Sequence, residues 1–247
     1  MRIIVAANYD EMSKKAADIV ASQIILKPES VVGLATGGTP VGFYNKLIKI
    51  HKDGKFSFKE VKTFNLDEYY GLDKDNTQSY HYYMMNNLFK HIDINIENVN
   101  IPSGTAKDIE VECKAYEAKI KNAGGIDIQV LGIGTNGHIG FNEPDVKFEA
   151  ITHLVKLDEE TIEANSRFFN SIEEVPKSAI SMGIKTIMHA KKIVLLASGI
   201  EKAKVIERMM NGDITPDLPA SILQLHPDVT LILDKDAASE LIEEDIK

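Results

Sequence analysis

Short apolar runs alternate along the chain with longer segments of amphipathic helical periodicity, and this alternation strongly limits the fold. The runs occupy residues 2–6, 31–35, 61–66, 126–133, 192–197 and 229–233, and the amphipathic segments occupy residues 10–26, 41–51, 79–91, 109–121 and 200–210. Runs that are apolar throughout are typical of parallel strands buried on both faces of a sheet. The pattern therefore predicts an α/β fold, with a single open, mostly parallel sheet covered by helices on both faces.

The domain organisation follows from the same pattern. No internal repeat, low-complexity tract or long Pro/Gly/Ser linker interrupts it, so we expect residues 1–247 to form a single domain. The segment 141–177 lacks a strong strand pattern and is polar. We interpret it as a surface helix or a mobile lid over a site, with the lid around residues 158–185.

Composition and charge disfavour several classes of partner. The net charge of −9 argues against a nucleic acid or an anionic membrane surface, because both attract clustered Lys and Arg. The one cysteine, Cys113, allows no disulfide within the chain, which fits a reducing compartment. No apolar segment is long enough for a transmembrane helix, and the chain starts without a signal-like apolar run. We expect a soluble cytoplasmic protein.

A glycine-rich loop follows the run at 31–35, at the edge of the sheet where α/β proteins place their sites. Gly37 and Gly38 let the backbone approach a ligand closely, and Thr36 and Thr39 add hydroxyl groups. The helix that begins near Pro40 offers free N–H groups and a partial positive charge. The loop is neither a Walker loop nor a GxGxxG fingerprint. Two interpretations stay open: an anion site suited to phosphate, or a tight turn without a ligand.

Acidic and basic side chains follow two more of these runs. Asp67, directly after residues 61–66, is either a catalytic base facing a cleft or a carboxylate that caps a turn or helix. His138, in a loop rich in glycine, suits proton transfer near neutral pH, and Glu143 would orient its ring. A purely structural His138 is the alternative. We expect no metal, because the spacing differs from HExxH and no further His or Cys is nearby.

Two basic residues complete the set of candidates. Lys202 is expected in the first turn of the helix at 200–210, where an anion would be shared between the lysine and the helix N-terminus. Arg167 lies in the predicted lid, and its planar fork suits a bidentate phosphate contact. The alternatives are a solvated lysine and a surface salt bridge between Arg167 and neighbouring acids.

Taken together, the motifs resemble the glucosamine-6-phosphate deaminase family. The matching stretches are residues 33–40 (GLATGGTP), 64–69 (FNLDEY), 137–144 (GHIGFNEP), 165–169 (NSRFF) and 221–227 (SILQLHP), which span most of the chain in order. The resemblance implies a Rossmann-like α/β fold and a cofactor-free conversion of glucosamine 6-phosphate and water into fructose 6-phosphate and ammonia. It implies that Asp67 moves a proton between C2 and C1, that His138 opens the pyranose ring, and that Glu143 orients His138. The residues implied to bind phosphate are Gly37, Gly38, Thr39, Arg167 and Lys202.

The sequence departs from the family pattern in two places. Asn136 stands where many members carry an Asp; it cannot exchange a proton but can hold the imidazole by a hydrogen bond, which leaves Glu143 as the charged partner. Some members are hexamers activated by N-acetylglucosamine 6-phosphate through basic residues after the histidine loop. Here that stretch has Val146, His153 and Val155, so we expect little or no such activation. The resemblance leaves a monomer and a homo-oligomer equally open.

Two other functions compete with the deaminase. A 6-phosphogluconolactonase resembles this family in fold, but the Asn-Leu-Asp-Glu-Tyr stretch at 65–69 favours the deaminase. An effector-binding module of a transcriptional regulator would reuse the same fold. The acidic chain, with its first strand expected at residue 2, disfavours that module.

Overall fold

The central element of the computed structural model, which describes residues 1–242 and Asp245, is a seven-stranded sheet in which every strand pairing is parallel. Its order is β1-β10-β9-β6-β2-β3-β5. The strands are β1 (Arg2–Ala6), β2 (Val31–Leu34), β3 (Lys62–Asn65), β5 (Val99–Asn100), β6 (Ile128–Leu131), β9 (Ile193–Ala197) and β10 (Val229–Asp234). The predicted α/β class with a mostly parallel central sheet is confirmed, and each of the six apolar runs overlaps a strand.

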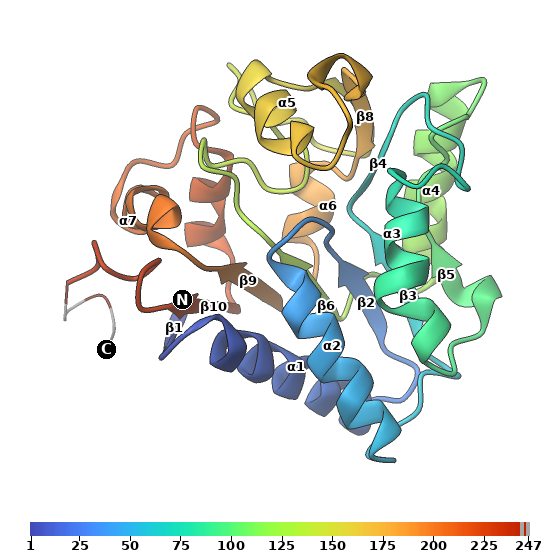
Figure 1. Ribbon diagram of the computed structural model, residues 1–247, viewed down its shortest axis with the longest axis horizontal. Coiled ribbons are helices and arrows are strands. Elements are labelled where there is room, and N and C mark those ends of the chain that lie inside the picture. Colours follow the sequence, from blue (N-terminus) through green and yellow to red (C-terminus); the bar gives the residue numbers. More distant parts are fainter. Residues whose placement is uncertain (243–244, 246–247) are drawn as a thin grey trace.

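Helices cover both faces of this sheet (Figure 1). The helices α1 (Tyr9–Leu26), α2 (Pro40–Lys52) and α3 (Tyr80–Asn87) share one buried apolar cluster with the sheet. The helices α4 (Ile109–Asn122), α6 (Ile184–Met188) and α7 (Ala203–Asn211) share the cluster on the opposite face. Short 3₁₀ turns lie at η1 (Phe89–His91), η2 (Ile96–Asn98), η3 (Ile172–Glu174), η4 (Ile200–Lys202) and η5 (Pro219–Leu225).

A second, smaller sheet corrects the prediction of a single sheet. The strands β4 (Asp67–Tyr69), β8 (Ser178–Ser181) and β7 (His153–Lys156) pair antiparallel in the order β4-β8-β7. The helix α5 (Glu159–Ser166) lies between β7 and β8 in the chain, so the segment 141–177 contains both a strand and a helix. In Figure 1, α5 and β8 lie together above the central strands. The mobility of the predicted lid at 158–185 stays a prediction.

The two sheets meet at Leu66. Its backbone N–H donates to Leu34 of β2, and its carbonyl accepts from the N–H of Met182, which follows β8. The chain therefore passes from β3 of the large sheet directly into β4 of the small one, at the carboxyl edge of the parallel strands. No helix in the described part of the chain is both long and apolar enough to span a bilayer.

Candidate active site

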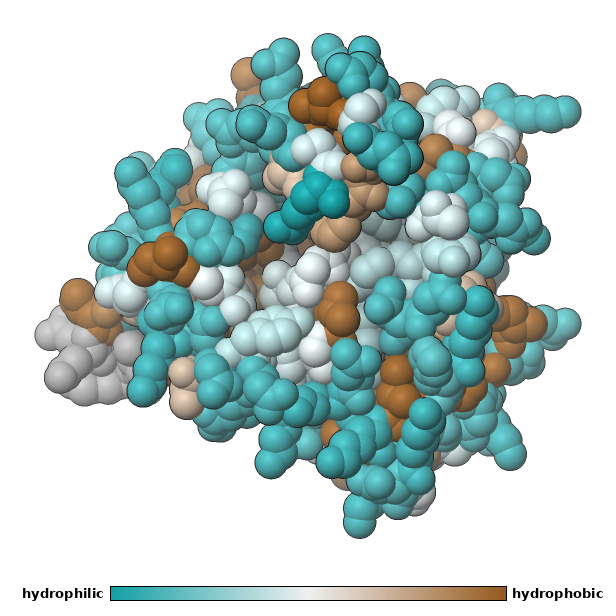
Figure 2. All heavy atoms as spheres, in the orientation of Figure 1, coloured by the Kyte–Doolittle hydropathy of each residue, from teal (hydrophilic) through white to brown (hydrophobic). Residues whose placement is uncertain are grey.

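An open cleft of about 400 Å³ lies at the carboxyl edge of the central sheet. Figure 2 shows a hollow between the upper part of the molecule and the central strands, and its floor consists of residues of intermediate hydropathy. The loops after β2, β3, β6 and β9 all contribute to its lining. Of the predicted site residues, the cleft is lined by Thr36, Gly37, Gly38, Thr39, Asp67, Asn136, His138, Arg167 and Lys202. Glu143 lies behind His138, within ion-pairing distance of its ring.

The glycine-rich loop presents an open helix N-terminus to the cleft. Gly37 has φ +95°, a value that residues with a Cβ rarely adopt. Thr39 precedes α2 in a helical conformation and makes no side-chain capping bond, so its hydroxyl is not used by the helix. The hydroxyl of Tyr9 takes that role instead, because it accepts a hydrogen bond from Gly42 N at 2.8 Å and donates to Thr39 O at 2.9 Å. These features suit an anion-binding loop.

The two basic residues approach this loop from other elements. The Arg167 guanidinium lies near Gly38, with Nη2 at 3.8 Å from the position that a Cβ on Gly38 would take. Arg167 stacks on Phe168 and makes no ion pair with any described residue, so the surface salt bridge that was the alternative to a phosphate contact is absent from that part of the chain. Lys202 ends η4 and directly precedes α7, rather than lying within the first α-helical turn.

The environment of Lys202 favours an anion beside it. Burial is the main reason that the pKa of Lys202 lies below its usual range. The Glu201 carboxylate opposes this shift, and the like charge of Arg167 adds to it. A bound phosphate would relieve the repulsion between the two cations and compensate for the desolvation of Lys202.

Asp67 begins β4 and is 5% exposed, opposite Ser181 of β8. Burial, with a smaller contribution from the neighbouring Glu68 carboxylate, raises the pKa of Asp67 to about 8. The capping role considered for Asp67 belongs to Glu68, whose carboxylate accepts hydrogen bonds from the backbone N–H groups of Tyr80 and His81 at the start of α3. Asp67 is therefore a buried carboxyl group that faces the cleft and caps no helix.

His138 and Glu143 form a hydrogen-bonded pair. His138 Nδ1 lies 3.2 Å from Glu143 Oε2. Burial raises the pKa of Glu143, but the hydrogen bond from His138 and further bonds from Thr161 and Asn136 outweigh this effect, so its pKa lies below its usual range. Gly134 is required for this placement of the ring, because a Cβ there would lie 2.4 Å from His138 Cε1.

Asn136 supports this pair differently from the prediction. Its side-chain Nδ2 donates to Glu143 Oε2 at 3.0 Å, and its Oδ1 accepts from the backbone N–H of His138 at 3.1 Å. The expected hydrogen bond from Asn136 to the imidazole is thus replaced by one to the carboxylate and one to the backbone. Asn136 fixes the loop and the acid, and Glu143 in turn holds the ring.

Several residues that line the cleft were missed by the sequence analysis. They are Tyr9, Tyr80, Thr161, Ser198 and Glu201. Ser198 and Glu201 follow β9, as Lys202 does, whereas Tyr9, Tyr80 and Thr161 belong to helices and reach the cleft through tertiary packing. His226, from the motif at 221–227, lies outside the cleft: Nε2 is 2.8 Å from Ala190 O, and Nδ1 accepts from Asp228 N at 3.1 Å. Its role is structural.

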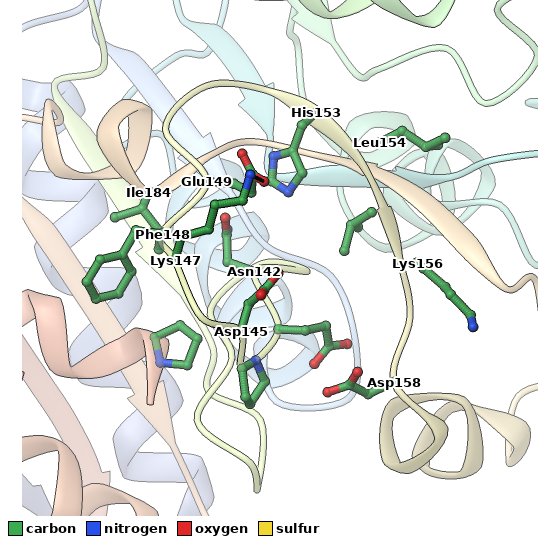
Figure 3. Close-up of a pocket in the computed structure, with 14 residues that line it drawn as sticks. Asn142, Asp145, Lys147, Phe148, Glu149, His153, Leu154, Lys156, Asp158 and Ile184 are labelled. Atoms are coloured by element: carbon green, nitrogen blue, oxygen red, sulfur yellow. Dashed lines mark ion pairs between the residues drawn. The ribbon is translucent and has the colours of Figure 1, made fainter. Parts of the chain in front are cut away.

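A second pocket, of about 220 Å³, is lined by residues that include Asn142, Asp145 and Asp158 (Figure 3). Its acidic lining residues are Glu143, Asp145, Glu149 and Asp158. Two lysines also line it, Lys147, which is paired with Glu149 at 2.8 Å, and Lys156. His153 and Val155, from the predicted effector region, also line this pocket.

The fold and the cleft define a class of protein: an α/β enzyme with paired acid–base groups beside an anion-binding loop. The profile of the family described as "Glucosamine-6-phosphate isomerases/6-phosphogluconolactonase" matches residues 5–232. The chain belongs to this family.

Individual proteins with known names also resemble this chain over nearly its whole length. The chain is 65% identical over 241 residues to a glucosamine-6-phosphate deaminase of Clostridium botulinum (strain Langeland), covering 98% of this chain and 99% of the relative. It is 66% identical to the deaminase of Clostridium acetobutylicum, covering 98% and 100%. A solved structure described as a monomeric glucosamine-6-phosphate deaminase superposes with a TM-score of 0.95 at 49% identity, covering 97% and 100%. A 6-phosphogluconolactonase from Trypanosoma brucei, at 20% identity and a TM-score of 0.77, shares the fold alone, with 98% of each chain covered.

Proposed function

We propose that this protein is a glucosamine-6-phosphate deaminase, which converts glucosamine 6-phosphate and water into fructose 6-phosphate and ammonia. The observation that carries the proposal is the convergence in one cleft of Asp67, the His138–Glu143 pair and the Gly37–Gly38 loop. The identity of about two thirds to deaminases over almost the whole chain supports it. The reaction isomerises an aldose and hydrolyses a C–N bond, which requires positioned acids and bases and no cofactor.

The phosphate binds at the glycine-rich loop. The Gly37–Gly38 backbone, the residues Thr36 and Thr39 with their hydroxyl groups, and the basic residues Arg167 and Lys202 all line this cleft. A phosphate held at C6 is remote from the reacting carbons, so its binding energy serves to place C1 and C2 against the acid–base groups.

His138 acts first, on the closed sugar ring. Glu143 holds Nδ1, and the ring hydrogen bonds among the described residues involve only that nitrogen. Nε2 is therefore available to accept the proton of the anomeric hydroxyl and to deliver a proton to the ring oxygen. The result is the open-chain aldehyde, with the ionised Glu143 stabilising the charged imidazolium while the proton is in transit.

Asp67 acts second, on the open chain. Its carboxylate removes the proton from C2 while a proton of the substrate ammonium group passes to O1, which gives an enolamine; Asp67 then returns its proton to C1, which leaves a protonated imine at C2. Water adds to that carbon, and ammonia leaves. Burial keeps Asp67 protonated in the free enzyme at neutral pH. The ammonium group of the substrate would favour the ionised base when the substrate binds.

A coupled assay tests the proposal directly. Purified protein should release one ammonia for each fructose 6-phosphate formed from glucosamine 6-phosphate. A parallel assay with 6-phosphogluconolactone tests the nearest alternative. Hydrolysis of the lactone without ammonia release from the amino sugar would overturn the proposal, as would sugar-phosphate binding without turnover, which is expected of a regulatory module.

We also propose that N-acetylglucosamine 6-phosphate does not activate the enzyme. The pocket in Figure 3 presents acids at Glu143, Asp145 and Asp158, and these disfavour a phosphorylated ligand. Velocity curves with and without the acetylated sugar should superimpose. A shift from sigmoid to hyperbolic curves on its addition would contradict this expectation.

For the assembly and location, we propose a monomer in the cytoplasm whose partner is the small-molecule substrate. The relative at 49% identity is described as monomeric, which favours the monomer over a homo-oligomer. Light scattering at assay concentration should give the mass of one chain, 27.4 kDa.

A further inference from the structure

Thr161 is the one residue of α5 whose side chain is buried, with 3% exposure. Its hydroxyl oxygen lies 3.4 Å from His138 Nδ1. The same hydroxyl also contributes to the low pKa of Glu143 through a side-chain hydrogen bond. Thr161 therefore contacts both members of the histidine–glutamate pair, although it belongs to a different element of the fold.

The donor and acceptor roles at this contact fix the form of the imidazole. When the Nδ1 proton points to Glu143 Oε2, the Thr161 hydroxyl can donate its own proton to the carboxylate and offer a lone pair to Nδ1–H. This arrangement favours the tautomer that is protonated on Nδ1 and leaves Nε2 as an acceptor on the cleft side. A neutral histidine protonated on Nε2 would lose its bond to Glu143, and the Thr161 hydroxyl could then donate its one proton either to Nδ1 or to the carboxylate but not to both.

The position of Thr161 in α5 connects this pair to the phosphate site. Residues Thr161, Ala164 and Asn165 follow the i, i+3, i+4 spacing of one helix face, and all three line the cleft. Arg167, the residue that directly follows α5, reaches the Gly38 end of the cleft. A phosphate bound by Arg167 would thus restrain the helix that places Thr161 against His138.

We infer that Thr161 is a positioning residue for ring opening, and that α5 couples phosphate binding at Arg167 to the tautomer of His138. The inference rests on the proposed function for the identity of the substrate. The contacts of Thr161 with His138 and Glu143 are independent of that identity. Thr161 touches the acid–base pair and acts through it, without contacting the reacting atoms.

Two substitutions of Thr161 separate its hydroxyl from its shape. Thr161→Val keeps the volume and removes the hydroxyl, and it should lower kcat by about tenfold, with KM nearly unchanged. Thr161→Ser keeps the hydroxyl and should restore most of kcat. The matched control is Thr186→Val, which removes another buried threonine hydroxyl, bonded to Glu117 Oε1 at 2.7 Å and outside the cleft. It should leave kcat and KM unchanged. A Thr161→Val enzyme with the kcat of the native enzyme would overturn the inference.

The protonation of the His138 ring can be measured by NMR without any turnover. Nitrogen-15 NMR of the His138 ring should show Nδ1 protonated and Nε2 free, and inorganic phosphate should increase that population. In Thr161→Val the phosphate should bind with similar affinity but no longer change the ring signals. A native His138 protonated on Nε2, or ring signals insensitive to bound phosphate, would contradict the coupling. If the native protein had no deaminase activity, the proposed function, and not the coupling through α5, would be refuted.

Discussion

At the scale of single residues, Asp67 in the cleft and Glu143 behind His138 are carboxyl groups with opposite environments. Glu143 receives hydrogen bonds from His138 and Asn136, which favour its ionised form. Asp67 is buried and forms no ion pair with any residue that the structure describes, and its pKa is raised to about 8. Two carboxyl groups whose pKa values are moved apart by their surroundings are typical of divided acid–base roles. The division agrees with Glu143 as the ionised support of His138 and Asp67 as the group that gains and loses a proton.

Replacing Asp67 by Asn tests the base. Asp67→Asn should lower kcat by about 10²–10⁴-fold while leaving sugar-phosphate binding largely intact, because the phosphate contacts are unchanged. In the native enzyme, solvent deuterium should enter C1 of the product. The matched control is Asp127→Asn, which alters a buried carboxylate bonded to Lys27 and Lys191, outside the cleft; it should keep the native kcat. Near-native turnover by Asp67→Asn would remove Asp67 from the mechanism.

The raised pKa of Asp67 also predicts a pH dependence. The free enzyme must lose the Asp67 proton before the carboxylate can act as a base, and kcat/KM reports groups in the free enzyme. We expect kcat/KM to rise by about tenfold per pH unit on the acid side and to level off above a pH of about 8. Initial rates at low substrate across this range would measure it. A profile that is already flat on the acid side would show that Asp67 is ionised before substrate arrives.

At the scale of elements, the start of α3 depends on a side chain from a strand. Glu68 of β4 accepts hydrogen bonds from Tyr80 N and His81 N, both at 2.8 Å, while Ser79 accepts from Tyr82 N at 3.0 Å. The small sheet and α3 are therefore joined through one carboxylate.

Removing this carboxylate should loosen the junction. Glu68→Ala leaves the first N–H groups of α3 without their acceptor, and we expect a loss of about 1–2 kcal/mol in the free energy of unfolding. Urea denaturation would measure it. Glu110→Ala, at an exposed glutamate in the first turn of α4, is the control and should change the stability little. Equal effects of the two substitutions would show that Glu68 contributes no more than a surface residue.

The elements also show where sequence patterns were sufficient and where they were not. Strands buried on both faces, such as β9, are apolar throughout and were predicted within a residue or two. β7 was missed because its four residues, His153–Lys156, alternate between exposed and partly buried positions and include two basic side chains. Asp67, His138 and Lys202 were singled out from the sequence because each comes after an apolar run that forms a strand of the central sheet. Thr161 was not found, since its approach to His138 depends on how α5 packs, and local sequence carries no signal of that packing.

At the scale of the whole molecule, the catalytic cleft should reduce stability in a pH-dependent way. The pKa of Asp67 is about 8 in the folded chain, against an ordinary value of 3.8. Between these values the folded chain retains a proton that the unfolded chain has released. The free energy of unfolding therefore falls as the pH rises through this window, at most by about 1.4 kcal/mol per pH unit.

Calorimetry of the native protein and Asp67→Asn across this window would measure the effect. Because Asn does not ionise, the variant lacks this loss, and its Tm should exceed the native Tm by a margin that grows with pH. A margin that stays constant with pH would show that the carboxyl group does not titrate abnormally. The result would separate the cost of burying the base from its catalytic benefit.

The junction of the two sheets at Leu66 has a mechanical consequence. Leu66 forms backbone hydrogen bonds with Leu34 of the large sheet and with Met182, which follows β8 of the small sheet. We therefore expect a tilt of the small sheet to turn about this residue. Asp67 is the adjacent residue, whereas Arg167 lies at the far end of α5. In a rigid-body rotation, the residues nearest the axis move least. Any tilt of the small sheet about Leu66 would therefore move Asp67 less than the more distant parts of that sheet, so the Asp67 carboxyl group would keep its place at the cleft.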